Sequence, residues 1–184
     1  MDAIKHIALV SCALAPLSAC SDRGVAENVH TPKGPGSTSG ALLCSIAETE
    51  LFRCSLKGST ISVCASSGRA AVRTALEHPG DSSLVAEAAS RIRSSLTWGI
   101  QGYSGGGETQ ILGSAPNGTV VFYDRLAKTS SPSAPSQISG IAIVQRRHKF
   151  VDEKCNPDPA ASINPNLVRK FLSKGETVDW SSLR

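Results

Sequence analysis

Histidine, methionine and aromatic side chains are scarce in this sequence of 184 residues. It contains four histidines, one methionine, two tryptophans, two tyrosines and four phenylalanines. The histidines do not cluster with cysteines or carboxylates, which argues against a metal site or a histidine-based acid–base centre. The formal net charge is only +4, and aromatic residues do not alternate with basic ones as on many nucleic-acid-binding surfaces. We therefore expect no metal, no cofactor and no nucleic-acid partner.

The sequence also lacks a hydrophobic run long enough for a lasting transmembrane helix. Residues 7–17 are mostly apolar and follow Lys5, but a bilayer span needs ~20 such residues. The run ends in Leu17-Ser18-Ala19-Cys20, which resembles the lipobox of bacterial lipoproteins. The resemblance implies that residues 1–19 are a signal peptide and that Cys20 receives the lipid. The alternative is an ordinary secretory signal cleaved near Ala19.

Acyl chains on Cys20 would hold the protein on a membrane, because several buried chains make release very slow. By the sorting rule of enteric lipoproteins, Ser21 favours the outer membrane. Residues 20–42 are rich in Gly, Ser, Thr and Pro, so we expect a flexible tether with a reach on the order of 25 Å. We expect residues 43–184 to form one β-rich domain on the periplasmic side of the envelope.

The stretch ELFRCSLKGSTISVCAS predicts a β-hairpin. Apolar residues alternate with polar ones on both sides of Lys57-Gly58, which is typical of two strands joined by a tight turn. In this register Cys54 lies opposite Ile61, whereas Cys64 points to the other face. A direct bond between Cys54 and Cys64 is therefore not expected.

Four cysteines remain after the signal segment and the lipid-bearing residue are set aside. An even number in an oxidising compartment predicts two disulfides rather than a zinc site. Three pairings are open, and we favour the first cysteine with the second and the third with the fourth. The four residues are Cys44, Cys54, Cys64 and Cys155.

Helical spacing of apolar residues predicts a helix over residues 83–95, behind Asp81-Ser82-Ser83 as possible caps. A second helix is predicted after Asn164, with Pro165 in its first position and Gly175 as its stop. Four more strands are predicted, within WGIQ, ETQILGS, TVVFYDRL and ISGIAIVQ, and KFVDEKC completes another hairpin. The fold class we expect is mainly β (α+β): a small, disulfide-stapled antiparallel sandwich or open barrel with one or two short helices.

Gly102-Tyr103-Ser104-Gly105-Gly106 fits the G-x-S-x-G pattern of a nucleophilic serine. That chemistry needs a helix directly after the serine, yet three glycines and the strand-like ETQIL follow here. The motif also resembles the GDSGG of trypsin-like proteases, but no His–Asp pair lies upstream at a suitable spacing. We therefore predict a glycine turn and no catalytic residue.

Phe52, Cys54, Lys57-Gly58 and residues 61–66 (ISVCAS) resemble a family of small, exported, largely uncharacterised proteins of Gram-negative bacteria, with the pattern F-x-C, a turn, then V-S-V-C-A-S. Family members also have a glycine-rich turn and a late cysteine before a short helix, similar to residues 104–107 and to Cys155 with NPNLVRKFL. The resemblance implies a disulfide-bonded scaffold, and the family has no established activity that could be carried over to this chain. Residues 68–95 depart from the family, which leaves helix and strand open there.

These observations lead to three hypotheses of function. The favoured one is a non-catalytic binding module with a protein partner in the envelope, such as an inhibitor of, or immunity protein against, a cell-wall hydrolase. The alternatives are a serine hydrolase acting through Ser104 and a structural lipoprotein without a discrete partner. The basic stretch RRHK at residues 146–149 is interpreted as a solvated hairpin tip, with contact to acidic lipid or glycan as the alternative.

Overall fold

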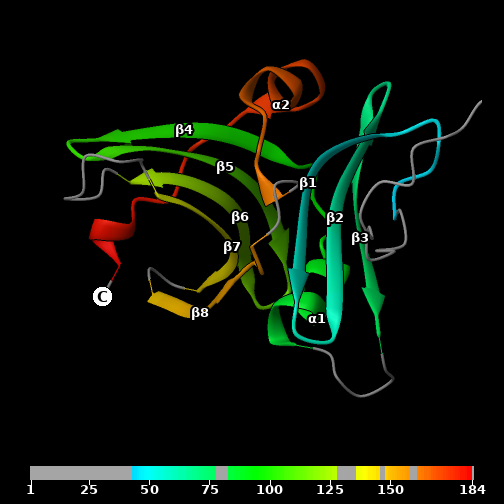
Figure 1. The fold of residues 1–184 in the computed structure, drawn as a ribbon, viewed down its shortest axis with the longest axis horizontal. Helices are drawn as coiled ribbons and strands as arrows, with labels where there is room; N and C mark the ends of the chain where they lie inside the picture. The colour runs from blue at the N-terminus through cyan, green and yellow to red at the C-terminus, as the bar shows by residue number, and fades with distance from the viewer. Residues whose placement is uncertain (1–42, 78–82, 128–135, 146–147, 158–160, 184) are drawn as a thin grey trace, which may run out of the picture. The chain divides into compact units, whose positions relative to one another are not determined.

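The protein folds as two β-sheets with two short α-helices (Figure 1). A computed structural model describes residues 43–77, 83–127, 136–145, 148–157 and 161–183. The predicted signal peptide, Cys20 and the tether lie outside these residues. The first sheet has the strand order β1-β2-β3 and the second β8-β7-β6-β5-β4-β9. The mainly β class is confirmed, and the sheets do not close into a barrel.

The three-stranded sheet contains the predicted hairpin. Strands β1 (Thr49–Leu56) and β2 (Ser59–Ser66) are antiparallel, and Cys54 lies opposite Ile61 as expected. The turn uses Gly58 at a φ of 78°, a backbone conformation that glycine adopts without steric cost. Strand β3 (Arg69–Leu76) completes the sheet, so the first part of the segment left open between helix and strand is a strand.

The six-stranded sheet is a meander of antiparallel strands with one short parallel strand at its edge. The hairpins predicted from alternation are present, and Pro116-Asn117 forms the turn between β5 and β6. The strands are β4 (Thr97–Tyr103), β5 (Gly106–Ala115), β6 (Gly118–Ala127), β7 (Ser136–Gln145), β8 (His148–Lys154) and β9 (Ser173–Lys174).

Helix α1 (Leu84–Ser90) is shorter than the helix predicted over residues 83–95. Ser83 caps it by accepting a hydrogen bond from the Ala86 amide. The helix ends early because the next residues bond to the β5 strand instead. The Arg93 amide donates to the Ser114 carbonyl at 3.1 Å, and the Ser114 amide donates to the Ser94 hydroxyl at 2.8 Å.

Helix α2 (Pro165–Phe171) begins as predicted, with the Asn164 side chain accepting from the first-turn amides. The prediction that Gly175 stops this helix is wrong. The chain is already extended at Leu172, and the next two residues form β9, parallel to β4. Gly175 instead lies against Thr97, where a Cβ atom would approach the threonine side chain to 2.7 Å.

The main hydrophobic core lies where one face of the six-stranded sheet meets β1, β2 and both helices. Phe52 of β1 packs edge-on against Phe122 of β6, with ring centroids 5.8 Å apart. A smaller cluster of Leu112, Val121, Tyr123 and Ala142 lies on the opposite face of the same sheet, against Val178 and Trp180. The C-terminal segment therefore covers part of that second face.

Candidate functional site

The structure pairs Cys44 with Cys64 and Cys54 with Cys155. Two disulfides from these four cysteines are confirmed, but the pairing favoured from the sequence is wrong. The expectation that Cys54 and Cys64 do not bond to each other holds. Because all four sulfurs are in disulfides, none of them is available as a thiolate ligand for zinc.

The observed pairing follows from how the two flanking segments approach the first hairpin. A turn closed by the Glu48 amide and the Ser45 carbonyl brings the chain before β1 back over Glu50, which lies opposite Cys64. At the other end, the Asn156 amide donates to the Ser55 carbonyl at 2.8 Å. This bond brings Cys155, directly after β8, beside Cys54 on the core face.

Ser104 lies in a two-residue turn between β4 and β5, where Tyr103 pairs with Gly106. The predicted turn is confirmed. A strand rather than a helix follows the serine, so the helix N-terminus that would stabilise negative charge in a nucleophile elbow is not beside it. The glycines after Ser104 form the turn and the first residues of β5.

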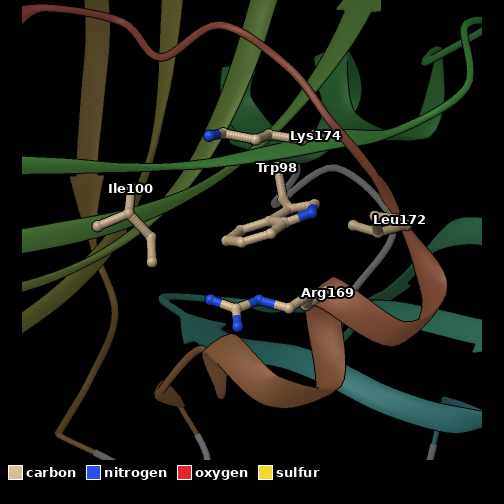
Figure 2. A pocket seen from close by; sticks show the side chains of 5 residues that line it. All are labelled: Trp98, Ile100, Arg169, Leu172 and Lys174. Carbon is tan, nitrogen blue, oxygen red and sulfur yellow. The ribbon is translucent and has the colours of Figure 1, made fainter.

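A groove lies between β4 and α2, on the core-facing side of the sheet near its edge (Figure 2). It encloses about 430 Å³, and its apolar lining comes from Trp98, Ile100 and Leu172. Arg169 reaches from α2 along the Trp98 ring, with its guanidinium carbon 5.6 Å from the ring centroid, a favourable cation–π distance. Lys174 of β9 also lines the groove.

The groove combines two features of binding surfaces. Its five lining residues include two cations and no carboxylate. Ile100 is 50% exposed, although a large aliphatic side chain in a strand usually contributes more by being buried. The site thus offers apolar contact area together with positive charge.

The edge of β4 beside this groove is open. In the described part of the chain, β9 pairs only with Thr97 and Trp98 on that side. Tyr103 pairs with Gly106 across the β4–β5 turn, so its backbone groups face β5. The Trp98 carbonyl faces the other way, because it accepts a hydrogen bond from the Gly175 amide at the outer edge. Alternate residues of a strand direct their backbone groups to opposite sides, so Ile100 and Gly102 direct theirs outward, beyond the end of β9.

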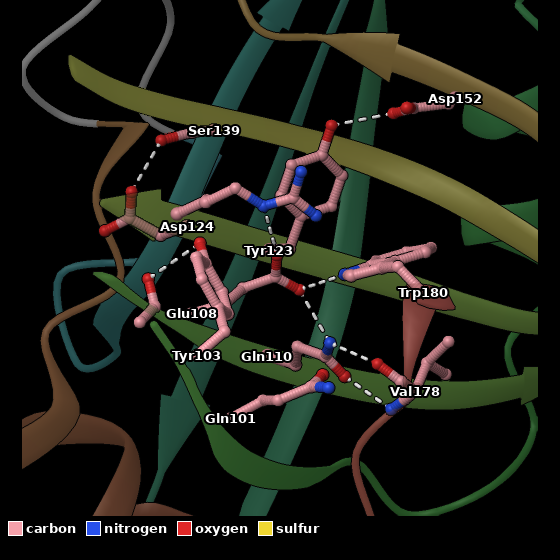
Figure 3. A network of polar contacts seen from close by, with 12 residues as sticks. Gln101, Tyr103, Glu108, Gln110, Tyr123, Asp124, Ser139, Asp152, Val178 and Trp180 are labelled. Carbon is pink, nitrogen blue, oxygen red and sulfur yellow. Dashed lines mark hydrogen bonds and ion pairs between the residues drawn. The ribbon is translucent and has the colours of Figure 1, made fainter. Parts of the chain in front are cut away.

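The opposite face of the sheet contains a buried polar cluster (Figure 3). The Glu108 carboxylate is buried and accepts hydrogen bonds from Arg125 at 2.7 Å, Gln110 at 2.6 Å and the Trp180 indole at 2.5 Å. Gln110 also exchanges two hydrogen bonds with the backbone of Val178. These bonds fasten the C-terminal segment, including the 3₁₀ helix η2 (Trp180–Ser182), onto the sheet.

Tyr123 extends the cluster toward β8. Its hydroxyl donates to Asp152 at 2.7 Å and accepts from Lys154, and burial followed by the contact with Asp152 raises the pKa of Tyr123 well above its usual range. Burial opposes ionisation of Asp152, but hydrogen bonds from Tyr123 and two lysines outweigh it and lower the pKa of the carboxyl. The charged groups here are paired with one another, which indicates a structural role.

Lys149, from the basic stretch RRHK, is one of the two lysines. Its ammonium group lies 2.9 Å from Asp152 and 5.9 Å from the centroid of the Trp180 ring. Residues 146–147 lie outside the described residues. The two described residues of the predicted tip, His148 and Lys149, are exposed as expected, and Lys149 also pairs with Asp152.

Sequence reasoning predicted the strand that contains Trp98 and Ile100, but it missed the groove beside them. Arg169 was within the predicted second helix, yet no spacing rule links a helix residue to a strand some seventy positions earlier. One signal was available. The strand TWGIQGY carries no charged residue, whereas strands at an exposed sheet edge usually carry a charge that prevents pairing with another chain. How much of the β4 edge stays open depends on the length of β9, which the sequence did not predict.

Comparisons with protein-family models, with curated proteins and with solved structures found no match to this chain. Among the described residues, no helix is both long and apolar enough to span a bilayer. The fold and the site define a disulfide-bonded, two-sheet β domain. Its distinguishing feature is a cationic, apolar groove beside a partly unpaired strand.

Proposed function

We propose that this protein is a lipid-anchored envelope protein whose folded domain is a non-catalytic binding module, and that the groove between β4 and α2 contacts its partner. The observation that carries the proposal is the half-exposed Ile100 beside the Trp98 ring and two cations. Aromatic and arginine side chains in a partly desolvated setting are the groups that dominate the energy of many protein interfaces. A protein partner therefore fits this surface better than a small polar metabolite does.

The anchoring part of the proposal depends on the sequence. The lipobox ending at Cys20 supports acylation, Ser21 favours the outer membrane, and residues 20–42 would let the domain search on the order of 25 Å from the lipid surface. The two disulfides are consistent with an oxidising compartment such as the periplasm. The resemblance to a family of exported Gram-negative proteins supports the same location.

Within this class, an inhibitor of, or an immunity protein against, a cell-wall hydrolase is one form that we propose. An accessory of envelope assembly is another. Both need a rigid domain with a binding surface, held near the membrane, and neither needs a catalytic group. Two competing hypotheses are a hydrolase acting through Ser104 and a structural lipoprotein with no discrete partner.

The test is crosslinking of the intact lipoprotein in its own cells, followed by mass spectrometry of the captured molecules. The controls are a chain with residues 1–42 fused to an unrelated domain and the double variant Arg169→Glu, Lys174→Glu. We expect one reproducible protein partner that both controls lose. Capture of peptidoglycan or lipid alone would contradict a binding module and favour the structural hypothesis.

The Ser104 hypothesis has its own test. The purified protein and its Ser104→Ala variant are assayed on a panel of ester and peptide substrates. We expect no difference between them. Activity that disappears with the Ser104 hydroxyl would contradict the proposal of a non-catalytic domain.

A further inference from the structure

We propose that the occupant of the groove is an extended, acidic segment of the partner protein, which adds to the outer edge of β4 as a further strand. The proposal rests on the function proposed above and specifies the chemistry of recognition. Strand addition combines main-chain hydrogen bonds along an open edge with pockets that take alternate side chains. The edge of β4 and the adjoining groove provide both.

The backbone groups needed for strand addition are in place. The N–H and C=O groups of Ile100 and Gly102 point away from β5 at the outer edge, and the short strand β9 ends before them. From Ile100 to Gly102 the free edge is ~7 Å long at the usual rise of a strand. A guest of about three residues could therefore form up to four main-chain hydrogen bonds with β4, beyond the two residues that β9 already pairs.

The side chains beside this edge would select the guest. Trp98 and Ile100 lie on the same face of β4, because side chains two residues apart point the same way, and both line the groove. An apolar side chain of the guest would enter there. Arg169 and Lys174 line the same space without a carboxylate among the lining residues. An acidic side chain two positions along the guest, which points to the same face, would therefore find unlike charge, which favours both selection and fast encounter.

The two edges of the six-stranded sheet differ in how they are protected against pairing with another strand. Proteins usually protect exposed edge strands with charges, proline or β-bulges. The opposite edge strand, β8, carries two lysines, one aspartate and one glutamate, and its pairing with β7 contains a register shift. Strand β4 has the sequence TWGIQGY, without charge or proline, and its pairing with β5 is regular. One edge of the same sheet is protected and the other is not.

A second copy of this chain is the competing occupant. Two β4 edges pairing about a two-fold axis would bring the Arg169 and Lys174 side chains of both copies to one junction. Like charges placed together disfavour such a contact. An acidic guest strand has no such penalty, which is why we assign the edge to a different protein.

The test uses hydrogen exchange, read residue by residue by mass spectrometry, on the intact lipoprotein in detergent. The probe is the synthetic peptide acetyl-Thr-Val-Thr-Glu-Thr-Val-Thr-amide, in which the two valines and the glutamate share one face of the strand, and the matched peptide has lysine in place of glutamate. We expect the acidic peptide to slow exchange several-fold at the amides of Ile100 and Gly102, with no effect on β8. We expect the double variant Arg169→Glu, Lys174→Glu to bind it about tenfold more weakly, equivalent to ~1.4 kcal/mol.

Gly102 offers a matched pair of variants. A Cβ atom at this position would meet nothing within 4 Å, so Gly102→Ala keeps the outward N–H and Gly102→Pro removes it, both without a clash at that atom. We expect only the proline variant to lose the peptide-induced protection of Ile100, with thermal unfolding verifying that both variants fold. If the proline variant does not fold, the charge-reversal variant carries the test, since its substitutions lie outside β4.

Three results would overturn strand addition. One is equal protection by the acidic and basic peptides, another is protection that survives in folded Gly102→Pro, and the third is concentration-dependent protection of β4 without peptide, which would indicate a second copy. A partner captured in cells but insensitive to Gly102→Pro would leave the binding module standing and reject only this mode of binding.

Discussion

Removing each disulfide separately should cost different amounts of stability, because the two bonds close loops of very different length. The Cys54–Cys155 bond joins residues 101 positions apart, and the Cys44–Cys64 bond joins residues 20 positions apart. A cross-link stabilises mainly by restricting the unfolded chain, and the restriction grows with loop length. The double variants Cys54→Ala, Cys155→Ala and Cys44→Ala, Cys64→Ala separate the two effects.

The chain-entropy relation assigns ~4.7 kcal/mol to a loop of about 100 residues and ~3.3 kcal/mol to one of about 20. Cys54 and Cys64 are both almost fully buried, at 0% and 1% exposure, so the packing lost with each of these sulfurs is similar. We therefore expect the free energy of unfolding to fall more for the Cys54, Cys155 variant, by ~1.4 kcal/mol. Urea unfolding followed by circular dichroism measures the difference.

The slope of the urea transition has to be compared as well, because a change in slope reports a change in the unfolded state. Equal losses for the two double variants, or a larger loss for the Cys44, Cys64 variant, would refute the reasoning from loop length. The pairing has an independent check. Proteolysis without reduction should release peptides linked through Cys44 and Cys64, and a peptide linking Cys44 to Cys54 would contradict the structure.

Three further predictions follow from the polar cluster and the anchor. Arg125→Met should lower the free energy of unfolding by about 3 kcal/mol in urea titration, because it leaves the buried Glu108 carboxylate without its cation; an unchanged midpoint would contradict this. The lowered pKa of Asp152 contributes stability above the pKa of the unfolded carboxyl, so stability should fall as acid protonates it. Asp152→Asn should flatten that decline below about pH 4, and an identical acid limb would be the contrary result. Cys20→Ala should move the protein from the membrane to the soluble fraction, and retention in the membrane would reject the lipid anchor.

Much of the fold could be predicted from the sequence where local chemistry decides the structure. Alternating apolar residues around Lys57-Gly58 and the turn at Pro116-Asn117 determine their hairpins within a few residues. Asn164 before Pro165 marks the start of α2 for the same reason, since capping needs only neighbouring groups. The hairpin register also correctly excluded a bond between its two cysteines.

The remaining features depend on contacts between distant segments. The end of α1 depends on hydrogen bonds to Ser114, which no pattern within residues 83–95 contains. The disulfide pairing depends on the turn before β1 and on where the chain after β8 meets Ser55. The groove depends on β9, a strand of two residues that is too short to give a periodic signal.

The measurement that tests the central claim most directly is photocrosslinking from a single position of the full chain in its own cells. A photoreactive amino acid replaces Ile100 in one strain and Leu76 of β3 in another; these side chains are similarly exposed, at 50% and 47%. The account predicts a discrete protein adduct from position 100 that is absent from position 76 and is lost when Arg169 and Lys174 are changed to glutamate. Equal crosslinking from both positions, or none from position 100, would contradict a binding module that acts through this groove.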